Sequence, residues 1–228
     1  MSSSNKNNAL LEIYDRLIAE YGPQHWWPGE TPFEVIIGAI LTQSAAWTNV
    51  EKAINNLKSA GMLSSREIRE LPVEELALLI RPSGYYNDKT RKLKSFVNRL
   101  YEKHEDSLDK LFALDVNSLR NELLSIHGIG EETADSIILY ASGKPVFVID
   151  AYTKRIINRI GLLTASEKYA VCQKYFMDNL PADLQMFTEY HALLVNLGKT
   201  ACRMVPVCEK CCLRDICRSH KTTHPAGE

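Results

Sequence analysis

The 228-residue chain lacks the features that mark several whole classes of protein. No apolar run reaches about 18 residues, the length that a membrane-spanning helix requires, so we expect no contact with a membrane. The opening residues, MSSSNKNNAL, are polar and lack the apolar core of a signal peptide. We therefore expect a cytoplasmic protein, associated with the nucleoid if the source is a prokaryote. Alternation of apolar and polar residues with a period of two, typical of half-buried strands, is nearly absent.

The chain also has almost no net charge, because it contains 27 basic and 28 acidic side chains. No overall positive field attracts an anionic partner, so any binding of nucleic acid must depend on local patches. Two stretches are locally basic. Charge alone favours solvated helix faces for both, and contact with phosphate is the alternative. Their basic residues are Lys89, Arg91, Lys92, Lys94, Arg99 and Lys103 in the first, and Lys199, Arg203, Lys210, Arg214, Arg218 and Lys221 in the second.

Apolar residues recur instead with the spacing of a helix. The pattern is clear over residues 10–17, 50–57 and 134–141, and weaker over 184–194. The one strand-like run, residues 146–149, has no obvious pairing partner, and we interpret it as a buried extended linker. The sequence therefore predicts an all-α protein.

A tight reversal is expected where one periodic helix runs into Gly128-Ile129-Gly130 and a second helix follows at once. Two glycines allow the chain to turn sharply, and Ile129 can fill the space between the helices. The turn leaves backbone N–H groups at a helix N-terminus, which suits a DNA phosphate. Taken alone, the segment is equally compatible with an ordinary helix–helix turn.

A single carboxylate, Asp150, follows the extended run at the start of another helix. The simplest role for an Asp at this place is helix N-cap. The helix N-terminus also stabilises the carboxylate as an anion. A fixed anion about twenty residues after a phosphate-binding hairpin could stabilise an oxocarbenium-like sugar and activate water.

In this order and spacing, the two motifs resemble those of the helix-hairpin-helix DNA glycosylase superfamily of endonuclease III, over about residues 33–217. The family signature is a hairpin of the form L-x-G-x-G followed by a catalytic Asp. Ile126 stands where the family usually has Leu, which keeps the apolar character. The resemblance implies that Gly128 and Gly130 bind DNA phosphate and that Asp150 is the catalytic residue.

The resemblance also implies an architecture of two α-helical lobes with a DNA-binding cleft between them. Residues 31–144 would form a six-helix barrel domain that carries the hairpin. Residues 1–30 and 145–228 would form the second helical domain, which ends in an iron–sulfur loop.

Five of the six cysteines crowd into the sixteen residues 202–217, near the C-terminus. In a reducing cytosol such crowding indicates a metal or cluster site sooner than disulfides. The resemblance implies a [4Fe-4S] cluster, whose usual ligands are thiolates, bracing a basic loop against DNA. The first gap is one residue shorter than the family spacing, so the role of Cys212 stays open. A four-cysteine zinc site is the alternative. The expected ligands are Cys202, Cys208, Cys211 and Cys217, and Cys172 is expected to be a buried apolar residue.

A departure from the family pattern follows the hairpin directly. Bifunctional members place a lysine there, which attacks the sugar and forms a Schiff base. Matching the two segments puts Glu132 at that position, and a carboxylate cannot form a Schiff base. We therefore expect hydrolysis of the N-glycosidic bond without AP lyase activity. Glu132 is either a second polar group of the pocket or a surface helix residue.

Tryptophans are expected near the substrate, although core packing is the usual role of a lone Trp. The strings WWP, LTQ and RPSGYYN resemble the 3-methyladenine branch of the endonuclease III-like glycosylases. This implies that Trp26 and Trp47 sandwich the flipped base, that Trp27 and Pro28 shape the wall, and that Gln43 fills the gap in the DNA. N-alkylated purines are cationic, and indole faces attract cations. Tyr85 and Tyr86 are expected to pack a helix start.

The resulting prediction is a monomeric, monofunctional base-excision DNA glycosylase that removes alkylated purines such as 3-methyladenine from damaged double-stranded DNA. Two alternatives stay open. One is an endonuclease III-type glycosylase/AP lyase for oxidised pyrimidines, against which Glu132 argues. The other is a damage-sensing DNA-binding protein without turnover, against which an intact Asp150 argues.

Overall fold

The structure is a computed structural model that describes residues 3–223 of the chain. Over this range the backbone forms helices joined by turns and irregular segments, and it contains no strand. The predicted all-α class is therefore confirmed. None of the helices in the described range has the length and apolar character that crossing a membrane would require.

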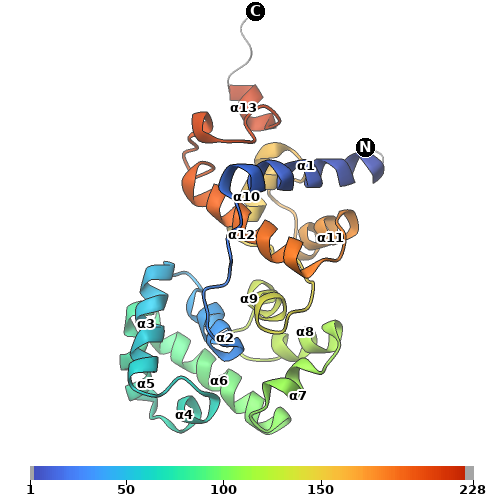
Figure 1. Cartoon of the computed structure of the whole chain (residues 1–228). Helices are drawn as coiled ribbons and strands as arrows, with labels where there is room; N and C mark the ends of the chain where they lie inside the picture. Colours follow the sequence, from blue (N-terminus) through green and yellow to red (C-terminus); the bar gives the residue numbers. More distant parts are fainter. Residues whose placement is uncertain (1–2, 224–228) are drawn as a thin grey trace, which may run out of the picture. The chain divides into compact units, whose positions relative to one another are not determined.

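The chain divides into two compact units. One is Trp27–Lys144, named here the hairpin unit. The other joins the residues up to Trp26 with those from Pro145 onward, and is named the cysteine unit. Figure 1 follows both units along the chain by colour.

The hairpin unit is built around α2 (Pro32–Leu41), which packs against four other helical elements of the unit. Thr31 caps this helix by accepting a hydrogen bond from the Glu34 N–H at 3.2 Å, and Pro32 fits the first helical turn because it needs no donor there. Residues 34–41 are all buried, as expected for a helix surrounded by others. The remaining elements of the unit are α3 (Trp47–Ser59), α4 (Ser65–Glu70), α5 (Val73–Leu79), a 3₁₀ turn (Arg81–Ser83), α6 (Tyr86–His104), α7 (Leu108–Phe112), α8 (Val116–Leu124), α9 (Glu131–Ser136) and a π-helical turn (Ile137–Ala141).

Helix α6 carries the first basic stretch, but its cations do not form the uniformly solvated face that charge alone favoured. Lys89 is 1% exposed, and its ammonium donates to the carbonyls of Leu41 and Ser83, both at 2.7 Å. Burial lowers the pKa of Lys89 to about 8. Arg99 pairs with Glu122 at 2.6 Å. For these residues the solvated-face interpretation is wrong, because long-range partners inside the unit occupy the charges.

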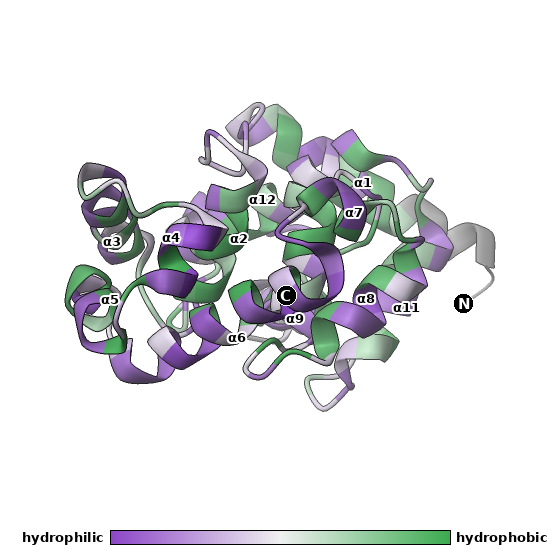
Figure 2. Cartoon of the chain, turned by 90° about the horizontal axis from the view of Figure 1, so that it is seen from below, coloured by the Kyte–Doolittle hydropathy of each residue, from purple (hydrophilic) through white to green (hydrophobic). Residues whose placement is uncertain are grey.

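The cysteine unit contains α1 (Ser3–Tyr21) and the helices that follow residue 150. Figure 2 shows green apolar and purple polar segments along α11 and α12 of this unit. These helices are α10 (Ala151–Ile160), α11 (Tyr169–Asn179), α12 (Leu184–Thr200) and α13 (Arg218–Thr223), with a 3₁₀ turn at Cys208–Lys210.

The strand-like run 146–149 is buried and forms neither helix nor strand, so its prediction as a buried linker is confirmed. Phe147 anchors it. Its ring stacks on Phe176 with centroids 4.1 Å apart and meets Phe187 and Tyr190 edge to face at 5.3 and 5.7 Å. This aromatic cluster fixes the chain three residues before Asp150.

Candidate functional site

The hairpin turn, residues 125–130, joins α8 to α9. Gly128 has a φ of +83°, in the left-handed region that favours glycine. Ile126 and Ile129 are 6% and 5% exposed, so the apolar plug expected between the two helices is present. Gly130 is exposed and precedes the first turn of α9, where backbone N–H groups lack helical partners. The turn therefore has the geometry that the sequence predicted.

Gly128 is also the place where another side chain crosses the hairpin turn. A Cβ added to Gly128 would lie 2.2 Å from Cγ of Lys92, on α6. The backbone angle and the close approach thus both require glycine here. Sequence reasoning found the angle but not the lysine, because residues 92 and 128 are distant in sequence.

Gln43, just after α2, is bound to the same turn. Its Nε2 donates to the Gly128 carbonyl and to Oγ1 of Thr133, each at 3.0 Å. Its Oε1 accepts from Nζ of Lys92 at 2.6 Å. The amide is thus ordered at the edge of the hairpin turn, and Lys92 is a contact that the sequence did not indicate.

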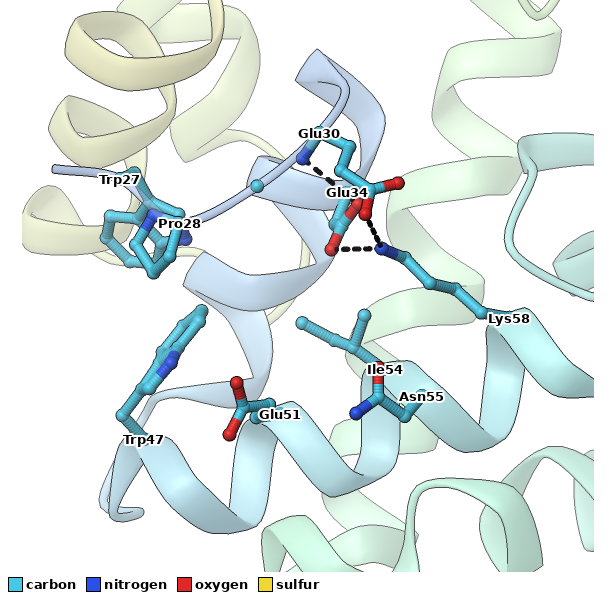
Figure 3. A pocket seen from close by; sticks show the side chains of 10 residues that line it. Trp27, Pro28, Glu30, Glu34, Trp47, Glu51, Ile54, Asn55 and Lys58 are labelled. Atoms are coloured by element: carbon cyan, nitrogen blue, oxygen red, sulfur yellow. Dashed lines mark hydrogen bonds and ion pairs between the residues drawn. The ribbon is translucent and has the colours of Figure 1, made fainter. Parts of the chain in front are cut away.

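A cavity of about 390 Å³ opens in the hairpin unit beside two of the predicted aromatic residues. The rings of Trp27 and Trp47 meet almost at right angles, with centroids 5.5 Å apart. Gly38 in α2 allows this approach, because a Cβ there would lie 3.1 Å from Nε1 of Trp27. Figure 3 shows the side chains around the cavity. Its lining residues are Trp27, Pro28, Gly29, Glu30, Glu34, Trp47, Glu51, Ile54, Asn55 and Lys58.

The cavity has more acidic than basic groups in its lining. Lys58 pairs with Glu34 at 2.9 Å and with Glu30 at 3.1 Å, the dashed lines of Figure 3. The hydrogen bond to Glu34 raises the pKa of Lys58. Glu51 adds a third carboxylate from the exposed side of α3. One ammonium against three carboxylates favours a cationic ligand over an anionic one.

Trp26 is not in the lining of this cavity and belongs to the cysteine unit. The ammonium of Lys199 lies 5.3 Å from the centre of its indole ring, a cation–π contact. The structure therefore gathers Trp27, Pro28 and Trp47 at one cavity. The sandwich of Trp26 with Trp47 stays a prediction.

Asp150 is the N-cap of α10, as predicted. Its Oδ1 accepts a hydrogen bond from the Thr153 N–H at 2.6 Å, and the residue is 9% exposed. The other carboxylate oxygen, Oδ2, lies 3.9 Å from Nε2 of His191 on α12. One oxygen is thus held by the helix backbone while the second faces an imidazole.

His191 is itself buried, at 5% exposure. Burial lowers its pKa, the charge of Asp150 opposes that shift and the charge of Lys199 adds to it. The imidazole is therefore neutral around pH 7. The periodic pattern of residues 184–194 indicated that His191 faces the core, but nothing in the sequence paired it with Asp150.

Glu132 lies in the first turn of α9 and is exposed. Its carbonyl accepts a hydrogen bond from Oγ of Ser136 at 2.7 Å, an ordinary contact within the helix. Within the hairpin unit Glu132 is thus a surface residue next to the hairpin turn. Its role as a pocket group stays a prediction.

The cysteine loop, residues 202–217, is tied to α10 through Arg159. Nη1 of Arg159 donates to Sγ of Cys202 at 3.3 Å, and Sγ of Cys217 lies 3.4 Å from the Arg159 carbonyl. The pKa of Cys211 is raised to about 11, first by burial and then by the charges of Cys212, Cys202 and Cys217. The pKa of Cys208 is raised by burial and by the charges of Cys217, Glu209 and Cys202. The four predicted ligands thus lie within electrostatic range of one another.

The four spaced cysteines offer sulfur ligands alone, and thiolates are the usual ligands of an iron–sulfur cluster. A [4Fe-4S] cluster binds each of four thiolates to a different iron atom, so the number of these cysteines fits it. Soft sulfur ligands also suit zinc, so a four-cysteine zinc site stays the alternative. In the part of the chain that the structure describes, no three cysteine, histidine or carboxylate groups are placed to hold one metal ion.

Cys212 lies near α1. Its carbonyl accepts from Nη1 of Arg16 at 3.4 Å. Burial raises its pKa, and the charged groups that act on it are Glu20 and Arg16 of α1 together with Asp215. Its charge also acts on Cys211, so its role beside the four predicted ligands stays open. Cys172 is 1% exposed, so its prediction as a buried apolar residue is confirmed.

The expectation that Tyr85 packs the start of a helix is wrong. The residue is 74% exposed and has a left-handed φ of +45° just before α6. Gly84 before it also has a positive φ, +68°. Two consecutive residues with positive φ thus form the turn before α6, and sequence periodicity cannot anticipate such a turn.

Comparisons of the sequence with known proteins point to one family. A sequence model described as "HhH-GPD superfamily base excision DNA repair protein" matches residues 37–182. The chain is 44% identical over 217 residues to the protein named "Putative DNA repair glycosylase MJ1434" of Methanocaldococcus jannaschii. That match covers 94% of this chain and 98% of the relative.

Two solved structures of bound complexes share the fold of this chain. An endonuclease III in a non-covalent complex with DNA matches with a TM-score of 0.84 and 22% identity, over 96% of this chain and 99% of the other. The H. pylori 3-methyladenine DNA glycosylase (MagIII) bound to 1,N6-ethenoadenine matches with a TM-score of 0.71 and 26% identity, over 87% and 98%. The first similarity concerns the fold alone, and it agrees with the all-α class.

Proposed function

The chain belongs to the HhH-GPD superfamily of base excision DNA repair proteins and is a DNA glycosylase, and on that premise we propose which bond it breaks and in which substrate. We propose a monofunctional enzyme that removes alkylated purines, such as 3-methyladenine, from damaged double-stranded DNA. It acts as a monomer in the cytoplasm. The observation that carries the proposal is the carboxylate of Asp150, held at a helix N-terminus with its second oxygen towards a neutral imidazole.

The proposed reaction is hydrolysis at C1′ of the damaged nucleotide. The bond from C1′ to the base nitrogen breaks, and its electron pair leaves with the base. Asp150 stabilises the positive charge that develops on the sugar. Water then adds to C1′ and gives up a proton, for which Asp150 is the positioned base. The product is an abasic site in an intact strand.

The absence of a lyase step rests on Glu132. It occupies the position after the hairpin where a bifunctional enzyme would carry its lysine, and it is exposed on α9. No amine at this position is available to attack C1′, so no Schiff base forms and the strand is not cut.

The substrate class rests on the cavity beside Trp27 and Trp47. A cationic purine gains from indole faces and from the excess of carboxylates in the lining. Such a base is also a good leaving group, so one carboxylate and a stacking surface are chemically sufficient. Similarity to MagIII, which was solved with 1,N6-ethenoadenine, supports the same class.

DNA would be held by the hairpin turn and by exposed cations of the second basic stretch. Gly128 and Gly130 offer backbone N–H groups to a phosphate, and Gln43 enters the gap that the flipped base leaves. The C-terminal cations Arg203, Lys210 and Arg214 are all exposed, so phosphate can reach them.

A [4Fe-4S] cluster would be held by Cys202, Cys208, Cys211 and Cys217. When bound, the cluster supplies four iron–thiolate bonds that cross-link the loop and keep its basic side chains in place. Arg159, which contacts both ends of this ligand set, links the loop to α10, the helix that Asp150 caps.

A panel of duplexes tests the proposal. Duplexes that carry a single 1,N6-ethenoadenine or a single thymine glycol, and DNA methylated at many sites by dimethyl sulfate, are compared for free base and for strand nicks. We expect release of methylated purine without nicks. Release of thymine glycol together with nicks would favour the endonuclease III-type alternative. Tight binding without release from any duplex would favour a damage-sensing protein.

A further inference from the structure

Lys92 on α6 lies between the hairpin turn and Gln43, the two parts of the hairpin unit proposed to contact DNA. Its aliphatic stem crosses Gly128 so closely that no Cβ fits there. Its ammonium donates to Oε1 of Gln43 at 2.6 Å and pairs with Asp88 at 2.8 Å. One side chain therefore contacts both the hairpin turn and the residue proposed to enter the DNA gap.

Every polar atom of the Gln43 amide has a hydrogen-bond partner in the hairpin unit. Its two amide hydrogens are donated to Gly128 in the hairpin turn and to Thr133 in α9, so Oε1 is the remaining polar atom of the group. Lys92 occupies that oxygen with a charged donor, which makes the stronger kind of hydrogen bond. The amide cannot rotate by 180° without placing its NH₂ against the ammonium.

The position of Lys92 makes it a poor phosphate ligand. Its side chain is only 18% exposed, and two acceptors already engage the ammonium. Asp88, whose pKa is lowered by hydrogen bonds from Lys92 and Arg91, holds the Lys92 ammonium in place from the preceding turn of α6. Arg91, by contrast, is 69% exposed and has no contact with Gln43 among the described hydrogen bonds.

We propose that Lys92 is a positioning residue that orders Gln43 against the hairpin turn, so that DNA bound by the hairpin meets an already oriented wedge. A free glutamine would lose side-chain entropy on entering the DNA, and ordering it beforehand removes that cost from the flipping step. The inference rests on the proposed function, because it assumes that Gln43 inserts into the duplex.

The test is a double-mutant cycle with Lys92→Met and Gln43→Ala in single-turnover base release. Met keeps the stem over Gly128 and removes the ammonium. We expect Lys92→Met to slow release by roughly tenfold in the otherwise unchanged protein, the range of a charged hydrogen bond. In the Gln43→Ala background the same change has no further effect, because Lys92 acts through Gln43. An equal loss in both backgrounds overturns the proposal, and so does faster release by Lys92→Met.

Two further variants separate positioning from charge and from folding. Arg91→Gln removes the same charge from the same helix and is expected to leave the release rate within about twofold. Lys92→Arg keeps a cationic donor and is expected to recover most of the rate. A loss in Arg91→Gln as large as that in Lys92→Met contradicts the proposal, since net charge would then explain both. Thermal melting of each variant identifies any loss that comes from unfolding.

A second readout does not require base release. Fluorescence of 2-aminopurine next to a tetrahydrofuran abasic site reports the local unstacking that a wedge causes. If the unchanged protein gives no signal, the proposed function fails. If Lys92→Met gives the full signal at saturating protein, only the inference about Lys92 fails.

Discussion

The two units of the chain hold their candidate functional groups in opposite ways. In the cysteine unit, Asp150 is 9% exposed, is fixed by its own helix and faces a buried imidazole. In the hairpin unit, Gly130 and Glu132 are exposed and the cavity beside Trp47 is open to a ligand. Chemistry requires a group held within a narrow range of geometry, whereas recognition requires surface that DNA can reach. The two units thus indicate a division between bond cleavage and recognition.

Individual cations of the two basic stretches also differ in how far they are exposed. On α6, Lys89 is buried between carbonyls and Arg99 is paired with Glu122. In the C-terminal stretch, Lys210 and Arg214 are exposed. Equal numbers of lysine and arginine in a sequence therefore say little about DNA binding until their partners are known.

The largest effect is expected from Asp150→Asn. Asn can still cap α10 but cannot stabilise a sugar cation or accept a proton from water. We expect base release to slow by about 10²–10⁴-fold, measured under single turnover, with DNA affinity and melting temperature nearly unchanged. Release at the unchanged rate would contradict the assignment of bond cleavage to the cysteine unit.

Loss of the cluster is the next largest effect, and two adjacent cysteines test it. Cys211→Ser removes a proposed ligand, so the visible absorbance of an iron–sulfur centre and part of the thermal stability should be lost. Cys212→Ser is the matched control and should keep the colour, because Cys212 is not among the four proposed ligands. A colourless protein that contains zinc would contradict the cluster.

Removal of an indole in the hairpin unit should have an intermediate effect. Trp47→Ala is expected to remove about 1–3 kcal/mol of base stacking and so to slow the release of alkylated purine. It should have little effect on affinity for undamaged DNA. The same measurement on Trp26→Ala, in the cysteine unit, tests the prediction that Trp26 and Trp47 sandwich the flipped base. Unaffected release in both variants would show that neither ring contacts the base.

The two basic stretches can be compared with one charge from each. Lys210→Gln should lower the slope of log K against log salt by about one, without a change in melting temperature. Arg99→Gln should instead destabilise the fold by about 1 kcal/mol, because it leaves Glu122 partly buried without its partner, and should keep the salt slope. The reverse pattern would contradict the assignment of the stretches.

The smallest effect concerns pH. Because burial lowers the pKa of His191 below 6.5, the unfolded chain takes up a proton below that pH that the folded chain does not. The free energy of unfolding should therefore fall as the pH drops from 6.5 towards the folded pKa. His191→Gln should flatten the pH dependence of the melting temperature between pH 7 and 5. An unchanged slope would show that His191 titrates normally.

Local patterns in the sequence predicted the helices, the turn at Gly128, the extended run before Asp150 and its cap. Each of these depends on neighbours within a few residues. The sequence did not predict the contacts of Lys92 with Gln43, of Asp150 with His191 or of Lys89 with Leu41, which join residues about 40 or more positions apart. A side chain's partner across the fold is set by packing, and no local pattern carries that information.

The central claim is that this enzyme releases a base and leaves the strand intact. The most direct measurement follows one end-labelled duplex with a single alkylated purine, and scores free base and strand scission in the same tube, with and without hot alkali. We predict complete base release, with scission only after alkali. Scission at the rate of base release in the untreated sample would contradict the account.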